Sequence, residues 1–307
     1  MLQQKEWLTL SHDHHHHHGD TGNIKVAFFL NLGFTIAEVI GGLLINSIAV
    51  LSDAVHDLGD SAALGLAWFL ARYSQKEGDE KYSYGYRRFS LLGALINSII
   101  LIVGSLLILS EAIPRLFDPE AFDAQGMIIF ALLGVAANGL AAFRMRQSES
   151  ANARVVGMHL LEDVLGWIAV LVVGVLSLFV DWPVLDPLLS IGITSFILYR
   201  VVRQFKTIVE LFLQAVPSES SLRLIQSRFE TVNAVCSTHH VHLWSLDGEH
   251  HVLTAHLVVD EGLTGDDVKR IKRESKAAIE DLDLGIEHMT LEIEFENTDC
   301  SMPEHHH

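Results

Sequence analysis

The sequence predicts an α-helical membrane protein with six transmembrane helices and a small α+β domain at its C-terminal end. Half of the 307 residues are hydrophobic, and from Pro217 onward the pattern becomes that of a soluble domain. A spanning helix needs about 20 predominantly apolar residues. Six stretches reach this length: about 24–45, 48–71, 89–112, 125–145, 155–180 and 184–205.

The basic residues predict how these helices are oriented. The loops after the second and fourth stretches and the end of the sixth each carry several of them, whereas the loops on the opposite side hold only Arg115. Positively charged loops stay on the cytoplasmic side of a membrane. Both termini are therefore expected in the cytoplasm, and a bacterial inner membrane is the expected location.

We expect the chain to contain four parts. A His-rich cytoplasmic segment (1–23) precedes the transmembrane domain (24–215), which is followed by a cytoplasmic domain (216–296) and a flexible tail (297–307). Periodicity in the cytoplasmic domain predicts helices and strands in the order α-β-β-α-β. This order predicts a small sheet with the helices on one face. The predicted ranges are 218–230, 238–246, 250–259, 264–281 and 286–296.

Charge and cysteine content restrict the class of partner. The formal net charge is −17, which does not suit nucleic acid but does suit cations. The sequence contains only Cys236 and Cys300, so neither a disulfide framework nor a Cys-x-x-Cys metal site is expected.

Two short motifs place ionisable groups at the expected depth of a bilayer, where they are costly and mark functional sites by default. His56-x3-Asp60 lies in the second expected span and His159-x3-Asp163 in the fifth. A spacing of four puts both side chains of a pair on one helix face. Together the two faces offer two imidazoles and two carboxylates, a tetrahedral set that suits Zn²⁺, with Co²⁺ and Cd²⁺ as alternatives. The competing interpretation is that these polar residues pack helices together and satisfy one another.

Other polar residues also lie within the expected spans. Asp57 points about 100° away from His56 and is expected to be a structural partner or a proton-carrying group. Asp53 lies one turn from His56, and a place at the outer exit is one of two open alternatives for it. Glu38, like Asn31, Asn97 and Asn138, is expected to form hydrogen bonds between helices. Contacts to the metal ligands are the alternative role for these residues.

The cytoplasmic domain offers a second candidate metal site. Asp247-Gly248 is a strong signal for a two-residue hairpin turn, in which Leu246 would pair with Glu249. Counting back along the strands places His239 opposite His256, with Cβ atoms about 5 Å apart. The last strand adds His288 and Glu294, which alternation places on the same side as Ile286. Ordinary polar strand residues are the alternative, and the role of His240 and His242 is left open between packing and binding.

Four segments resemble the cation diffusion facilitators, a family of zinc transporters. The segment from Ser47 to Asp60, SIAVLSDAVHDLGD, resembles the second-span signature of that family, and HLLED at 159–163 resembles its fifth-span motif. YGYRR at 84–88 is similar to its cytoplasmic loop, and 238–246 resembles its His-x-x-His-x-Trp strand. The resemblance covers roughly 24–296 and implies six helices, a ferredoxin-like cytoplasmic domain, a homodimer and Zn²⁺/H⁺ exchange.

The resemblance also implies which residues bind metal in the cytoplasmic domain. The family's ligands match His239, His256 and Glu294, with His288 as a further candidate, and the Zn²⁺ held there would be structural or regulatory. Some bacterial members carry another metal site, made from His and Asp, in the loop after the second span. Here that loop contains Asp79 and Glu80 but no histidine, so no site is expected in it.

A histidine run lies near the N-terminus of the sequence. It comprises His14, His15, His16, His17 and His18, preceded by His12. Such a run binds metal, so we expect it to capture cytoplasmic cations. An affinity tag is the alternative origin of the run.

The expected function is export of Zn²⁺ by alternating access. Metal and protons compete for the same imidazole and carboxylate lone pairs, so a proton gradient can drive release. The alternatives are a membrane zinc-dependent enzyme and a metal sensor or channel. A catalytic zinc has three protein ligands, an open water position and a base nearby. Four matched ligands therefore indicate a carrier rather than an enzyme.

Overall fold

The computed structural model describes residues 20–74, 76–146 and 151–296. The chain divides near residue 206 into two compact units, a helical unit and an α+β unit. The histidine run His14–His18 and the tail 297–307 lie outside the described residues.

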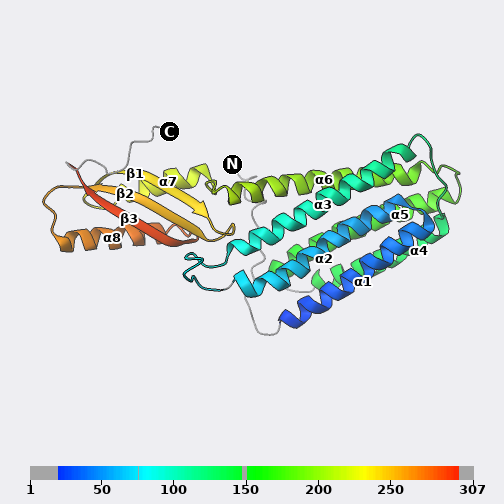
Figure 1. Ribbon diagram of the computed structural model, residues 1–307, viewed down its shortest axis with the longest axis horizontal. Coiled ribbons are helices and arrows are strands. Elements are labelled where there is room, and N and C mark those ends of the chain that lie inside the picture. Colours follow the sequence, from blue (N-terminus) through cyan, green and yellow to red (C-terminus); the bar gives the residue numbers. More distant parts are fainter. Residues whose placement is uncertain (1–19, 75, 147–150, 297–307) are drawn as a thin grey trace. The chain divides into compact units, whose positions relative to one another are not determined.

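The helical unit consists of six long helices that match the six predicted stretches (Figure 1). Among the described residues, α3, α6 and residues 124–143 of α4 are long and apolar enough to cross a membrane. The apolar part of α1, Asn31–Ile45, is shorter, and three aspartates lower the apolar character of α2. The helices are α1 (Asp20–Ile45), α2 (Ile48–Ser74), α3 (Arg88–Arg115), α4 (Ala124–Arg146), α5 (Ala151–Ser177) and α6 (Leu185–Phe212).

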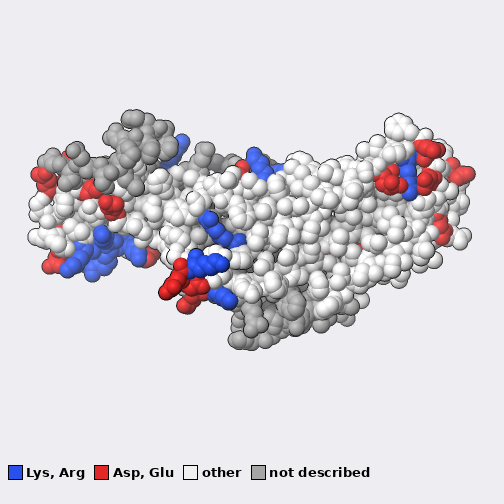
Figure 2. Space-filling view, viewed as in Figure 1, with Lys and Arg blue, Asp and Glu red and all other residues white. Residues whose placement is uncertain are grey.

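The outer surface of the helical unit is apolar. On the face shown in Figure 2, Lys, Arg, Asp and Glu gather toward the two ends of this unit and are nearly absent between them. Large aliphatic side chains of the helical unit are exposed, among them Ile36, Leu43, Leu106 and Leu107. An apolar surface of this extent marks contact with a membrane rather than with water.

A glycine on α4 lets α5 pack closely against it. Trp167 on α5 is fully buried and packs with Phe34 of α1 at a ring-centroid distance of 6.1 Å. A Cβ atom at Gly134 would lie 2.2 Å from the Trp167 ring, so only glycine fits at that position of α4. The buried Trp167 thereby fixes α5 against α1 and α4.

A carboxylate from α6 caps the start of α2. The Ile48 amide donates to Asp186 Oδ2 at 2.7 Å, and the Ser47 hydroxyl donates to Asp186 Oδ1 at 2.5 Å. Ser47 Oγ in turn accepts from the Val50 amide at 3.2 Å. The first amides of a helix lack partners within the helix and carry partial positive charge. Asp186 therefore lies in the first turn of α6 and anchors the start of α2.

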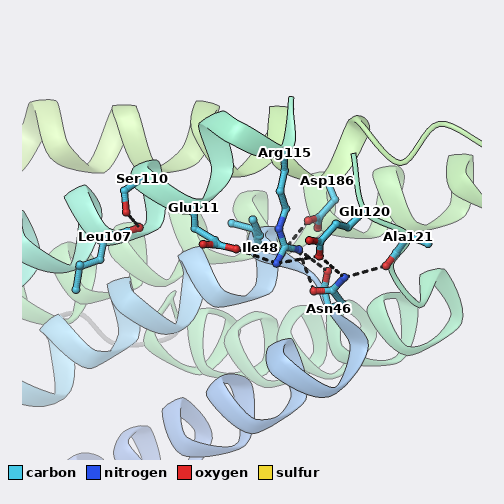
Figure 3. A network of polar contacts seen from close by, with 9 residues as sticks. All are labelled: Asn46, Ile48, Leu107, Ser110, Glu111, Arg115, Glu120, Ala121 and Asp186. Carbon is cyan, nitrogen blue, oxygen red and sulfur yellow. Dashed lines mark hydrogen bonds and ion pairs between the residues drawn. The ribbon is translucent and has the colours of Figure 1, made fainter. Parts of the chain in front are cut away.

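A network of polar contacts lies beside this cap (Figure 3). Arg115 donates to Asn46 Oδ1 at 2.9 Å and forms ion pairs with Glu111 at 3.1 Å and Glu120 at 3.3 Å. Asn46 also donates to the carbonyl oxygen of Ala121 at 2.9 Å. The network joins the turn between α1 and α2 to the end of α3 and the loop that follows it.

The α+β unit contains α7 (Glu219–Phe229), β1 (Val235–Ser245), β2 (His251–Val259), α8 (Gly265–Glu280) and β3 (Ile286–Phe295). The sheet order is β1-β2-β3; β1 and β2 are antiparallel, and β2 and β3 are parallel. Ile225 and Phe229 of α7 and Ile279 of α8 pack in one core with Leu253 and Leu257. The order α-β-β-α-β, with both helices packed on the sheet, is as predicted. A ferredoxin-like fold begins with one further strand, which the described residues do not contain.

The hairpin turn differs from the prediction. The Leu246 amide donates to the His250 carbonyl at 2.8 Å, so the loop has three residues instead of two. Asp247 Oδ1 stabilises it by accepting from the Glu249 and His250 amides at 3.0 and 2.8 Å. The longer loop shifts the pairing by one residue. A bulge between His239 and His242 reverses that shift, so His239 does pair with His256.

The start of β3 also departs from simple alternation. The pairing of β2 with β3 shifts by one residue between His251 and Val252. Ile286 consequently packs in the core beside Met289 and Leu291. The prediction that Ile286 shares a side with His288 was therefore wrong.

Candidate metal centres

Side chains of the two intramembrane motifs meet between α2 and α5. His56 Nε2 lies 3.4 Å from Asp163 Oδ1 and 4.0 Å from Asp60 Oδ2. The Asp163 side chain is 10% exposed, and those of His56 and Asp60 are 22% and 33% exposed. One imidazole nitrogen thus faces carboxylates from two helices that are about a hundred residues apart in sequence.

The fourth predicted ligand, His159, lies in α5 one turn before Asp163. Its side chain is outside the described part of the structure. The unbroken helix from Ala151 to Ser177 gives it the i, i+4 relation to Asp163 that the motif predicted.

The described geometry fits a small divalent cation. Zn–N and Zn–O bonds measure about 2.0–2.2 Å, so two ligand atoms on one tetrahedral ion lie about 3.3 Å apart. The 3.4 Å between His56 Nε2 and Asp163 Oδ1 already matches this spacing. The 4.0 Å to Asp60 requires a small side-chain rotation.

Glu162 is the carboxylate nearest in sequence to Asp163. It forms an ion pair with Arg200 of α6, and about half of its side chain is exposed. This contact directs the Glu162 carboxylate toward α6, whereas the neighbouring Asp163 faces His56.

A second group of acids, not predicted as a group, lies between α1 and α2. Glu38, Asp53 and Asp57 are 0%, 6% and 7% exposed, and one oxygen from each lies within 4.8 Å of the others. The hydrogen bond predicted for Asn31 exists, because its amide donates to Ser61 Oγ at 3.0 Å. Glu38 of α1 contacts the Asp57 carboxyl of α2, and no other described group donates to its oxygens. The packing register of α1 on α2 brings the three acids together, and periodicity does not reveal that register.

Three predicted residues of the cytoplasmic domain converge across the sheet. Glu294 Oε2 lies 3.0 Å from His239 Nε2, and Glu294 Oε1 lies 2.7 Å from His256 Nδ1. His256 is 7% exposed. One ligand atom from each residue lies within 4.8 Å of the others, a spacing at which they can share one metal ion.

Two further residues join this group. Glu292 Oε2 lies 3.4 Å from His256 Nε2, because the parallel pairing of β2 and β3 sets His256 opposite Glu292. His240 sits in the bulge at φ +47°, and its ring centroid lies 5.2 Å from those of both His239 and His256. Neither the crossover register nor the bulge can be deduced from strand periodicity.

His288 is not brought to this group. It is exposed and pairs with Val252, four residues along β2 from His256, which is about 13 Å at the rise of a strand. His242 is also exposed, and its ring lies 6.3 Å from that of His240. Within one chain, the predicted set of four therefore reduces to His239, His256 and Glu294.

Asp79 in the loop between α2 and α3 has a structural role. It accepts from the Lys81 and Tyr82 amides at 2.9 and 2.7 Å and from the Tyr86 hydroxyl at 2.6 Å. The Tyr86 hydrogen bond, with those amides, holds the pKa of Asp79 below its ordinary value. Asp79 oxygens thus serve the fold of the loop.

Comparisons with known proteins cover nearly the whole chain. The family model "Cation efflux transmembrane domain" matches residues 24–213, and "Cation efflux protein, cytoplasmic domain" matches 217–296. The zinc transporter ZitB of Pectobacterium atrosepticum is 32% identical over 306 residues, which cover 97% of this chain and 94% of that protein. The cadmium, cobalt and zinc/H(+)-K(+) antiporter of Bacillus velezensis is 32% identical over 290 residues, which cover 93% and 92%.

ZitB of Escherichia coli is 29% identical over 311 residues, with 96% of each chain covered. These matches confirm the resemblance first seen in the motifs, and they agree with the apolar surface of the helical unit. The chain is therefore an integral membrane protein and belongs to the cation efflux family.

Proposed function

We propose that this chain exports Zn²⁺ from the cytoplasm in exchange for protons, with His56, Asp60, His159 and Asp163 as the transport site. Efflux of a divalent cation follows from the family, and relatives are named as transporters of zinc or of cadmium, cobalt and zinc. The contact that carries the proposal is the 3.4 Å between His56 Nε2 and Asp163 Oδ1. It joins the motif of α2 to the motif of α5 at one point. Co²⁺ and Cd²⁺ fit the same ligands.

One nitrogen atom, His56 Nε2, can account for the exchange of metal for protons. His56 Nε2 faces both Asp163 and Asp60, and it can carry either a proton or a metal ion, but not both. When it is neutral, it completes a ligand set with the two carboxylates. When it is protonated, it forms ion pairs with them and excludes the cation. A proton taken up from the outer side therefore expels the metal.

The proposed architecture follows the charge pattern of the chain. All six long helices would span the membrane, with both termini in the cytoplasm, because the basic loops lie on one side. Helices α2 and α5, which carry the proposed ligands, and α1, which carries the buried Glu38, would line the route of the ion. The His-rich segment at 14–18 would gather cations at the cytoplasmic entrance, and a bacterial inner membrane is the proposed location.

The cytoplasmic domain is proposed to be ferredoxin-like and to mediate a homodimer. The dimer is supported by the match to the family's cytoplasmic domain at 217–296. A resident Zn²⁺ would be held by His239, His256 and Glu294, whose ligand atoms already lie 2.7 and 3.0 Å apart in pairs. Bound metal would neutralise the charge of Glu294 and tie the three strands together.

Zinc flux in proteoliposomes tests the transport site. Asp163→Asn keeps the shape of the side chain but removes one of the charges that face His56. Breaking a buried charge pair costs about 3 kcal/mol or more, or about 100-fold in affinity for the ion. We therefore expect flux to fall to background in Asp163→Asn. Asp118→Asn, at an exposed position after α3, is the matched control and should transport normally. Normal flux in Asp163→Asn would refute the site.

A further inference from the structure

The group formed by Glu38, Asp53 and Asp57, here termed the acidic triad, is distinct from the proposed transport site. Glu38 comes from α1, and the two aspartates lie one turn apart on α2. Figure 1 shows α1 running along α2, and Asn31 joins the two helices by donating to the Asp57 carbonyl at 3.1 Å and to Ser61 Oγ at 3.0 Å.

The Glu38 carboxylate points into this group and lacks a hydrogen-bond donor from outside it. It is fully buried, and apart from its contact with the Asp57 carboxyl, no group in the described part of the chain donates to its oxygens. Asp53 Oδ2 also meets no hydrogen-bond donor there. The groups nearest to these oxygens in the triad are other carboxylate oxygens, within 4.8 Å. Buried carboxylates without partners are costly, so these acids require either protons or a bound cation to neutralise them.

The spacing fits a single cation. Oxygen ligands of Mg²⁺, Mn²⁺ or Ca²⁺ lie about 2.0–2.6 Å from the ion, so they are separated by about 3–5 Å across it. One oxygen from each triad residue lies within 4.8 Å of the others, inside this range. All three donors are carboxylates, which hard cations prefer, whereas the group around His56 contains imidazole.

The two aspartates of the triad lie on a different stripe of α2 from His56 and Asp60. Asp53 precedes His56 by three residues, and Asp57 precedes Asp60 by three. Three residues correspond to about 300° of rotation and about 4.5 Å of rise. The two aspartates therefore lie on a stripe about 60° away from that of His56 and Asp60, and nearer the capped start of α2. Asp53 also approaches α5, because a Cβ atom at Gly166 would lie 3.9 Å from its Oδ1.

We propose that Glu38, Asp53 and Asp57 bind a hard divalent cation, with Mn²⁺ as the probe ion, at an all-oxygen site in the membrane domain. This site is separate from the one formed by His56, Asp60 and Asp163. The inference concerns binding alone, so it goes beyond the proposed function and stands or falls independently of zinc export.

Mn²⁺ titration of the purified full chain in lipid nanodiscs tests the proposal. The electron paramagnetic resonance signal of free Mn²⁺ gives the number of ions bound per chain. Glu38→Gln and Asp53→Asn, on different helices, should each bind one Mn²⁺ fewer than the unmodified chain. Glu111→Gln, at an exposed carboxylate of α3, is the matched control and should lose none.

Asp163→Asn separates the two sites. The Mn²⁺ ion that Glu38→Gln loses should still bind to Asp163→Asn, since Asp163 is not part of the triad. Undiminished Mn²⁺ binding in both triad variants would overturn the proposal and leave protons as what neutralises these acids. Loss of the same ion in Asp163→Asn would also overturn it, because the two groups would then form one site.

A second measurement needs no variant, and it tests the proposal if size-exclusion chromatography shows that a triad variant fails to fold. Electron spin-echo modulation of Mn²⁺ bound to the unmodified chain reports ¹⁴N nuclei of coordinating imidazoles. One class of bound Mn²⁺ without ¹⁴N coupling is expected from an all-carboxylate site. Nitrogen coupling at every bound Mn²⁺ would contradict it.

Discussion

The cap on α2 gives a prediction whose size can be worked from its contacts. Asp186 is 2% exposed and accepts from three donors: the Ser47 hydroxyl at 2.5 Å and the Ile48 and Ala49 amides at 2.7 and 3.3 Å. Asp186→Asn keeps the shape of the side chain but replaces one acceptor oxygen with a donor group. The charge facing the helix start is lost, and at least one buried donor is left opposite another donor.

The expected cost is the sum of two effects. A hydrogen bond to a charged group contributes about 1.5–3 kcal/mol, and a charge at a partly buried helix end contributes up to about 2 kcal/mol. We therefore expect Asp186→Asn to lower the free energy of unfolding by about 1.5–5 kcal/mol. Asp123→Asn is the matched control, because Asp123 is an exposed cap that accepts from the Gln125 amide at 3.0 Å. An exposed cap is worth about 1 kcal/mol.

Thermal unfolding in one detergent and hydrogen exchange of α2 amides measure the effect. Asp186→Asn should melt well below Asp123→Asn, with faster exchange in the first turns of α2. Zinc flux should fall as well, because His56 lies about 12 Å along the helix that the cap anchors. Equal melting of the two variants would show that the start of α2 does not depend on Asp186, and the reasoning would fail.

Two further predictions concern the cytoplasmic domain. Glu294→Gln in the full chain should lose the Zn²⁺ ion held with His239 and His256, because the Glu294 carboxylate contacts both rings. Metal analysis should show one Zn²⁺ fewer per chain than in the control variant Glu287→Gln. An unchanged Zn²⁺ count would exclude the site. Burial lowers the pKa of His251 below its ordinary 6.5, so the folded domain binds this proton less readily than the unfolded chain does. The contribution of His251 to the free energy of unfolding is therefore fully present above pH 6.5. It is lost as the pH falls through the lowered pKa that His251 has in the folded domain. Exchange of β2 amides should accelerate on acidification in the unmodified chain and less so in His251→Gln; equal acceleration would contradict this.

Much of the intramembrane site could be predicted from sequence because helical geometry is local. A spacing of four fixes the relation of His56 to Asp60 wherever the helix packs. The acidic triad could not be predicted in this way. The position of Glu38 relative to Asp53 depends on how α1 slides and rotates on α2, and small residues and Asn31 determine that contact, not periodicity.

The cytoplasmic domain shows a different limit. Its five elements were predicted within three residues at each end, because apolar periodicity and turn residues are strong there. The pairing of His239 with His256 was also predicted, although for an incomplete reason: a longer loop and a bulge offset each other. Whether Glu292 or His288 lies beside His256 depends on the register of β3, which pairs with β2 in parallel. A crossover helix sets that register, and no turn signal records it.

Proton movement coupled to zinc entry tests the central claim most directly. Proteoliposomes are loaded with a pH-sensitive dye at acidic pH, and Zn²⁺ is added to the outside. Exchange at His56 predicts that the lumen becomes more alkaline as Zn²⁺ enters, and that both signals vanish in Asp163→Asn. Entry of Zn²⁺ with no change in luminal pH would contradict competition between metal and proton for one nitrogen.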